Sequence, residues 1–134
     1  MSRDTEDRQV ELVRALFAAT GRGDWTTAES MLTDDFFVTE APTNPFAGVY
    51  RGKRALQDLY AQVIAASGVT GLDIKQLTVG GDLVVALVEM SFDGVPERVS
   101  LAEVFRFRDG KVCEIKPHYF DSQPLAAAVA LRKG

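Results

Sequence analysis

Helical spacing of apolar residues dominates the first half of the chain. Within Glu6 to Thr20 the apolar residues recur at steps of three and four, which places Val10, Val13, Leu16 and Phe17 on one helical face. Gly21 and Gly23 end this helix, and Asp24 is suited to cap the start of another. The same period then predicts a second helix that continues to Asp34 through Trp25, Ala28, Met31 and Leu32.

A short β-prone run and a third helix follow. Phe36 to Thr39 reads as a strand that ends at Glu40, because two prolines and a glycine in Ala41 to Gly48 disfavour regular structure. Helical spacing then returns between Lys53 and Ala66, where it involves Leu56, Leu59, Tyr60, Val63 and Ile64.

The second half of the chain has the pattern of a β-meander. Four β-rich runs are separated by the turn signals Gly80-Gly81-Asp82, Asp93-Gly94 and Asp109-Gly110; the runs are Leu72–Val79, Leu83–Phe92, Val99–Arg108 and Lys111–Phe120. The last stretch, Pro124 to Arg132, fits a short helix that packs on the sheet or on a neighbouring subunit. Helices followed by an antiparallel sheet predict an α+β fold, with three N-terminal helices covering one face of a curved sheet.

Composition narrows the possible classes of protein. The 134 residues, 46% of them hydrophobic, suit one domain over residues 1–134. A net charge of −4 with both signs scattered along the chain gives no basic stripe for nucleic acid. A single cysteine, Cys113, and a single histidine, His118, exclude an internal disulfide and a Cys/His metal site, and we expect no cofactor.

The charged start of the chain predicts a cytoplasmic protein. Met1 to Arg8 lacks the apolar core of a signal peptide. No stretch approaches the roughly 18 apolar residues that a membrane-spanning helix needs. We therefore expect no membrane partner.

Two stretches resemble bacterial ketosteroid isomerases and their SnoaL-like relatives in the nuclear transport factor 2-like superfamily. Gly23 to Glu40 (GDW…DDFFVTE) is similar to the isomerase stretch GD…DDATVED, and Val88 to Phe107 is similar to VEM…NG.P…D.MRF without a gap. The resemblance covers roughly Val10 to Asp121. It implies a cone-shaped α+β roll whose strongly curved, mostly antiparallel sheet encloses a hydrophobic pocket.

The resemblance also implies roles for two carboxyl groups. Glu40 falls on the isomerases' proton-moving acid, and Glu103 falls on their protonated acid in the oxyanion hole. Of three tyrosines in the isomerase pocket, the first falls on Leu16, another on Leu32, and only the third on a tyrosine, Tyr60. The oxyanion hole of a steroid isomerase is thus incomplete in this chain.

Strand alternation gives an independent reason to single out Glu103. Because side chains alternate along a strand, Glu103 shares a face with Leu101 and Phe105, which should be the core face. A glutamate there is expensive unless it is protonated or paired. The alternative is a shifted register that turns Glu103 outward toward Arg106 or Lys116.

Glu40 and His118 each leave two interpretations open. Glu40 lies where a strand meets a loop, a usual place for reactive groups, and is either a general base or a solvated strand-end glutamate. His118 with Asp121 could act on a bound water as in dehydratases. If Tyr119 faces the pocket, His118 faces outward, where a dimer interface is common in this superfamily.

Three functional hypotheses follow. The first is an acid–base enzyme that acts on an apolar carbonyl compound by isomerisation, cyclisation or dehydration, with Glu40 and Glu103 as catalytic residues. The second is a non-catalytic binding or dimerisation module, and the third is a hydrolase or dehydratase using His118 and Asp121. In the first, Tyr60 is a further possible catalytic residue, and the expected partners are an apolar ligand and a second copy of the chain. The expected substrate-binding wall consists of Leu16, Trp25, Val88, Met90, Phe105 and Tyr119.

Overall fold

The protein has four helices and six strands over residues 2–133, the part of the chain that the computed structural model describes. The expected domain over residues 1–134 extends one residue beyond this part at each end. In chain order the elements are α1 (Arg3–Gly21), α2 (Trp25–Ser30), β1 (Leu32–Glu40), β2 (Gly48–Arg51), α3 (Ala55–Ser67), β3 (Val69–Gly80), β4 (Leu83–Phe92), β5 (Val95–Arg108), β6 (Lys111–Tyr119) and α4 (Gln123–Lys133).

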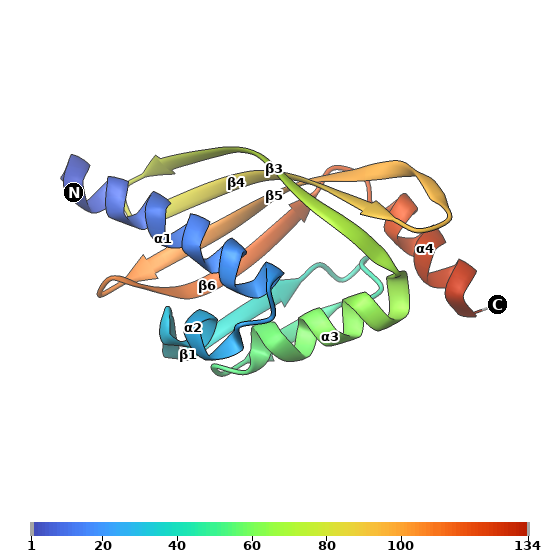
Figure 1. The fold of residues 1–134 in the computed structure, drawn as a ribbon, viewed down its shortest axis with the longest axis horizontal. Helices are drawn as coiled ribbons and strands as arrows, with labels where there is room; N and C mark the ends of the chain where they lie inside the picture. Colours follow the sequence, from blue (N-terminus) through green and yellow to red (C-terminus); the bar gives the residue numbers. More distant parts are fainter. Residues whose placement is uncertain (1, 134) are drawn as a thin grey trace.

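The six strands form one twisted sheet in the order β2-β1-β6-β5-β4-β3 (Figure 1). All neighbouring strands are antiparallel except β1 and β6, which run parallel. The predicted meander of four long strands is therefore confirmed. The two-residue turn between β5 and β6 has positive φ at both Asp109 and Gly110, a conformation that aspartate and glycine adopt more readily than most residues.

Three helices lie across one face of the sheet, which confirms the α+β fold (Figure 1). The Ser2 hydroxyl caps α1 by accepting from the backbone N–H of Thr5, and the Asp24 carboxylate caps α2 through Thr27, as the sequence predicts for Asp24. Large side chains that are almost fully buried fill the space between the helices and the sheet, among them Val13, Leu32, Phe36, Val38, Val88 and Phe105.

The second helix is shorter than its apolar spacing predicts. It ends at Ser30, and Leu32 begins β1 rather than continuing the helix to Asp34. The backbone carbonyl of Met31 accepts a hydrogen bond from Val112, and Leu32 pairs with the same residue of β6. Pairing with a strand 80 positions away in sequence overrides the local helical pattern.

A short edge strand, β2, was not predicted. It pairs with β1 so that Glu40 lies opposite Gly48, and the seven residues between them form the connecting loop. Because this loop replaces a tight two-residue turn, the sequence around it carries no hairpin signal.

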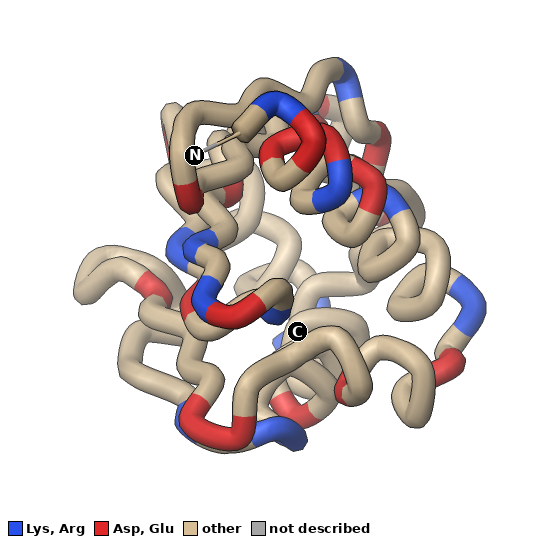
Figure 2. The backbone as a smooth tube through the Cα atoms, turned by 90° about the vertical axis from the view of Figure 1, so that its left-hand side faces the viewer, with Lys and Arg blue, Asp and Glu red and all other residues tan. Residues whose placement is uncertain are grey.

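Acidic and basic residues are interspersed along the backbone (Figure 2). Some of these charged residues form ion pairs on the surface, for example Lys75 with Asp73 and Arg108 with Asp35. Among the described residues, no helix is both long enough and apolar enough to cross a membrane.

The C-terminal helix α4 packs on its own chain. It lies against α3 and β5 and buries Leu125, Ala128 and Val129. Of the two placements that the sequence left open, the structure thus shows packing within the chain.

We predict that Leu125→Ala lowers the free energy of unfolding by about 2–5 kcal/mol, because it opens a cavity beneath α4. Leu131→Ala, on the same helix but 56% exposed, should change it by less than about 1 kcal/mol. Urea unfolding of both variants measures the difference. Equal effects would contradict the packing of α4 described above.

Candidate functional site

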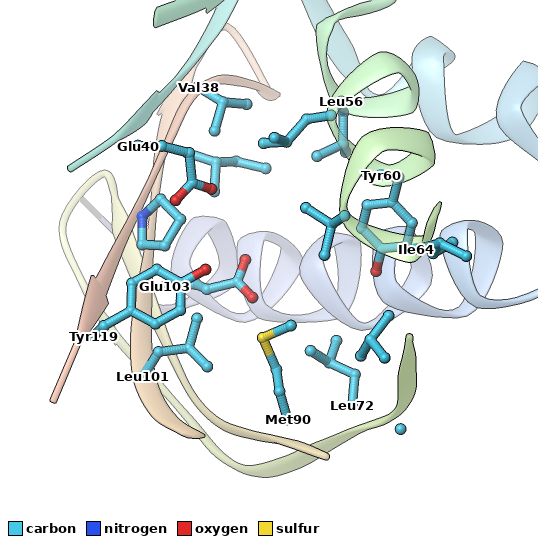
Figure 3. A pocket seen from close by; sticks show the side chains of 16 residues that line it. Val38, Glu40, Leu56, Tyr60, Ile64, Leu72, Met90, Leu101, Glu103 and Tyr119 are labelled. Atoms are coloured by element: carbon cyan, nitrogen blue, oxygen red, sulfur yellow. The ribbon is translucent and has the colours of Figure 1, made fainter. Parts of the chain in front are cut away.

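A cavity of about 270 Å³ lies between α3 and the inner face of the sheet. Four of the residues that line it carry a side-chain carboxyl or hydroxyl group, and the rest are apolar or glycine (Figure 3). The lining residues are Val38, Glu40, Leu56, Leu59, Tyr60, Val63, Ile64, Val69, Gly71, Leu72, Met90, Leu101, Glu103, Ile115, Pro117 and Tyr119. Ile64 is 53% exposed and therefore lies at the mouth.

Glu103 reaches the cavity from the middle of β5. The strand alternates, and its neighbours Leu101 and Phe105 point to the same inner face and are buried. Its cross-strand partners are Ala86 of β4 and Pro117 of β6, so the backbone around it is fixed on both sides. The residue is half-buried and lines the cavity.

Glu40 reaches the same cavity from the last position of β1. Its side chain is only 5% exposed. Asn44, in the following loop, donates a hydrogen bond of 3.1 Å from Nδ2 to Oε1 of Glu40. Figure 3 shows the carboxyl groups of Glu40 and Glu103 directed into one space, with Tyr119 beside Glu103 and Tyr60 on the opposite wall.

Burial changes the acidity of both carboxyl groups. It raises the pKa of Glu103 to about 7. Burial, with a further contribution from the charge on Glu103, raises the pKa of Glu40 to about 7. Because the repulsion is mutual, the two groups titrate as a pair, and near neutral pH the doubly charged state is disfavoured.

Two tyrosines complete the polar part of the lining. Burial raises the pKa of the Tyr119 phenol, and the charges of Glu40 and Glu103 add to this effect, against a hydrogen bond with Asn44 that lowers it. Burial also raises the pKa of Tyr60, against a hydrogen bond with Thr20 that lowers it. Both phenols are therefore neutral hydrogen-bond donors at physiological pH.

Of the residues expected to form the substrate-binding wall, Met90 and Tyr119 line the cavity and four others do not. Leu16, Val88 and Phe105 are at most 2% exposed and belong to the packed core. Phe105 packs edge-on against Phe17 at 5.6 Å between ring centroids. Trp25 lies behind the wall, edge-on to Tyr60 at 5.3 Å, so apolar spacing alone did not separate core from lining.

His118 and Asp121 lie outside this cavity. Both are exposed and line a separate groove on the other side of Pro117 and Tyr119. Strand alternation along β6 turns His118 away from the face to which Tyr119 points. The structure therefore does not bring His118 and Asp121 together with Glu40 and Glu103.

Several residues of the site were missed in the sequence. Most come from α3 and the start of β3, namely Leu56, Leu59, Val63, Ile64, Val69, Gly71 and Leu72. Their helical spacing was visible, but the distance between α3 and the sheet was not. Asn44, in the proline-containing loop, gave no signal beyond its position four residues after Glu40.

Within residues 2–133, no group of three or more His, Cys, Asp or Glu side chains is placed to hold a metal ion. The cavity places two carboxyl groups and two phenols among apolar walls, an arrangement that can exchange protons with an apolar molecule. One of the two carboxyl groups can hold a proton while the other is charged.

A sequence profile of the SnoaL-like domain matches residues 13–115, which is more than half of the chain. The chain belongs to the SnoaL-like domain family. A search of curated proteins found no significant match.

Several solved structures, some of them named NTF2-like, are similar to this chain over most of their length. The protein Bal32a from a soil-derived mobile gene cassette is 19% identical, with a TM-score of 0.79 over 90% of this chain and 95% of that one. An NTF2-like protein from Burkholderia xenovorans is 23% identical, with a TM-score of 0.75 over 92% and 97%. A candidate polyketide cyclase from Sinorhizobium meliloti is 18% identical, with a TM-score of 0.68 over 81% and 94%. These similarities establish the fold.

The raised pKa values predict a distinctive pH dependence of stability. Between the ordinary pKa of 4.5 and about 7, the folded carboxyl groups hold protons that the unfolded chain has lost. The contribution of Glu40 and Glu103 to the free energy of unfolding should therefore fall as the pH rises through this window, by about 1.4 kcal/mol per unit of pKa shift.

Urea unfolding between about pH 4 and pH 8 tests this expectation. In the double variant Glu40→Gln/Glu103→Gln, this decrease in the free energy of unfolding with rising pH should be absent. In Glu97→Gln, which changes an exposed position, the decrease should remain. An identical pH profile in the double variant and the unmodified protein would contradict the raised pKa values.

Proposed function

We propose that this SnoaL-like domain catalyses general acid–base proton transfer on an apolar, carbonyl-containing small molecule bound between Glu40 and Glu103. One observation carries the proposal: two carboxyl groups with pKa values near 7 face one mostly apolar cavity. A catalytic acid or base is most effective when its pKa lies close to the working pH. Ordinary surface glutamates, with a pKa near 4.5, do not meet this condition.

The proposed reaction begins with the carboxylate of Glu40. It removes a proton from the carbon next to the carbonyl group, and the electrons of the C–H bond form a carbon–carbon double bond. Neutral Glu103 donates a hydrogen bond to the carbonyl oxygen, on which negative charge develops. Glu40 then returns its proton to the substrate and regains its starting charge. Isomerisation, cyclisation and dehydration share the first of these steps.

The lining favours an uncharged substrate. Among the described residues, no lysine, arginine or histidine lines the cavity, so a carboxylate or phosphate group would meet two acidic side chains and no counter-charge. The apolar walls provide the affinity, and four polar side chains orient the ligand. A neutral ketone or enone fits this pattern.

Tyr119 is our candidate for the second donor to the carbonyl oxygen. The isomerases use a tyrosine where this chain has Leu16, which is packed in the core. The Tyr119 phenol lies beside Glu103 and is neutral, so it can serve the same oxygen from a different strand (Figure 3). Tyr60 faces the other side of the same ligand space.

We predict that Glu40→Gln slows proton exchange at the carbon next to a ketone by about 10²–10⁴-fold, because it removes the general base. The assay follows exchange of these protons for deuterium by NMR, using a panel of uncharged cyclic ketones in D₂O. Binding of the same ketones should persist and can be followed through the fluorescence of Trp25, which packs on Tyr60 of the cavity wall.

Glu97→Gln, at an exposed position, serves as the matched control and should leave exchange unchanged. Exchange at the unmodified rate in Glu40→Gln would contradict the proposal. Binding without any exchange in the unmodified protein would instead favour the alternative, a non-catalytic small-molecule-binding module. The observation that supports this alternative is the mostly apolar lining of the cavity, which can bind a small molecule without any reaction.

We further propose that the outer face of the sheet pairs with a second copy of the chain. Phe120 is 90% exposed and Leu87 42% exposed, and both line one groove on this face. Lys75 and Arg98 alternate there with the acidic Asp73 and Glu89, so two copies related by a two-fold axis can place opposite charges together.

Phe120→Asp should therefore convert a dimer to a monomer in sedimentation experiments, since it puts a charge into the apolar interface. Val49→Asp, on β2 at the edge of the sheet and 49% exposed, should leave the dimer intact. A monomeric unmodified protein, or equal dissociation by both variants, would contradict this interface.

A further inference from the structure

The loop that follows Glu40 is organised around Asn44. The backbone N–H of Asn44 donates to the carbonyl of Ala41, and the Asn44 carbonyl accepts from Ala47. Its side chain makes two more hydrogen bonds, to Glu40 and to the backbone of Phe46. The residue is 5% exposed, so all four hydrogen bonds are made inside the protein.

These contacts determine how the Asn44 amide is turned. The backbone N–H of Phe46 can only donate, so the side-chain atom at 2.8 Å from it must be the amide oxygen. The amide nitrogen therefore faces Glu40, where it donates to Oε1 at 3.1 Å. The orientation follows from the backbone and does not depend on the protonation of Glu40.

The two carboxyl groups of the cavity thus have different partners. Glu40 accepts a hydrogen bond from the side-chain amide of Asn44, which favours the charged form of Glu40. Hydrogen bonds to the loop backbone fix the position of this amide. Among the described residues, no hydrogen bond to Glu103 is present: burial alone raises its pKa, although the Tyr119 phenol lies beside it (Figure 3). The group without a donor is the one that is less costly to keep neutral.

We infer that Asn44 is a positioning residue that assigns the roles of the pair, so that Glu40 is the charged base and Glu103 the neutral acid. The inference deepens the proposed function, on which its catalytic meaning rests. Asn44 acts through Glu40, because its amide lies behind that carboxyl group and does not line the cavity.

The remaining groups around Glu40 do not supply this asymmetry. Glu103 from β5 repels its charge. The hydroxyl of Tyr50 from β2 donates to the carbonyl of Phe46, and the phenol of Tyr119 from β6 has a hydrogen bond with Asn44 that lowers its pKa. Tyr60 from α3 lies across the cavity (Figure 3). Within residues 2–133, no lysine or arginine lines the cavity that could favour one carboxylate over the other.

The test is a carbon-13 NMR titration of the labelled glutamate carboxyl groups, assigned with Glu40→Gln and Glu103→Gln. In the unmodified protein we expect Glu40 to lose its proton at lower pH than Glu103. In Asn44→Ala, the midpoint for Glu40 should rise by about one pH unit, which removes or reverses this order.

Two further variants separate positioning from loop damage. Asn44→Asp keeps an oxygen that accepts from Phe46, loses the donor to Glu40 and adds a like charge beside it, so it should raise the Glu40 midpoint by more than Asn44→Ala does. Thr43→Ala changes an exposed neighbour in the same loop and should leave both midpoints unchanged. An Asn44→Asp variant that titrates like the unmodified protein would overturn the inference.

The titration needs no substrate, so its outcome is independent of the proposed reaction. Glu103 losing its proton before Glu40 in the unmodified protein would overturn the role of Asn44 while leaving a proton-transfer site in place. The expected order in a protein without any ketone exchange would support the inference about Asn44 and contradict the proposed function.

Discussion

The removal of two carboxyl groups from water is the constraint on which the rest of this site depends. A buried carboxylate is costly, and a second one nearby is costlier, so the pair near neutral pH keeps a proton that ordinary glutamates lose. The fold maintains this situation through rigid parts. Glu103 is held between two neighbouring strands, and Glu40 sits at a strand end whose loop is fixed by hydrogen bonds of Asn44.

Much of the fold could be read from the sequence because its signals are local. The Asp109-Gly110 turn, the alternating strands and the apolar stripe of α1 each specify structure within a few residues. The two failures have different causes. Leu32 belongs to a strand because it pairs with Val112, which lies 80 positions away, and local spacing carries no information about such pairing. The edge strand β2 pairs with the nearby β1, but the seven-residue loop between them carries no hairpin signal.

In the site, too, the residues with a local sequence signal were predicted and those without one were not. Alternation along β5 was sufficient to direct Glu103 inward, and the position of Glu40 between a strand and a loop was sufficient to single it out. The walls were harder to predict because Leu16, Val88 and Phe105 have the same apolar spacing as true lining residues but are packed against neighbours. Only the gap between α3 and the sheet distinguishes a cavity wall from core, and Asn44 becomes visible only when the loop closes on Glu40.

The central claim is that the cavity holds one proton on two carboxyl groups at neutral pH. Infrared spectroscopy of the intact protein near pH 7 measures this most directly, because a protonated carboxyl group has a C=O stretch that a carboxylate lacks. The account predicts a protonated-acid signal of about one group per chain, lost in the double variant Glu40→Gln/Glu103→Gln. A spectrum with carboxylates alone at that pH would contradict it.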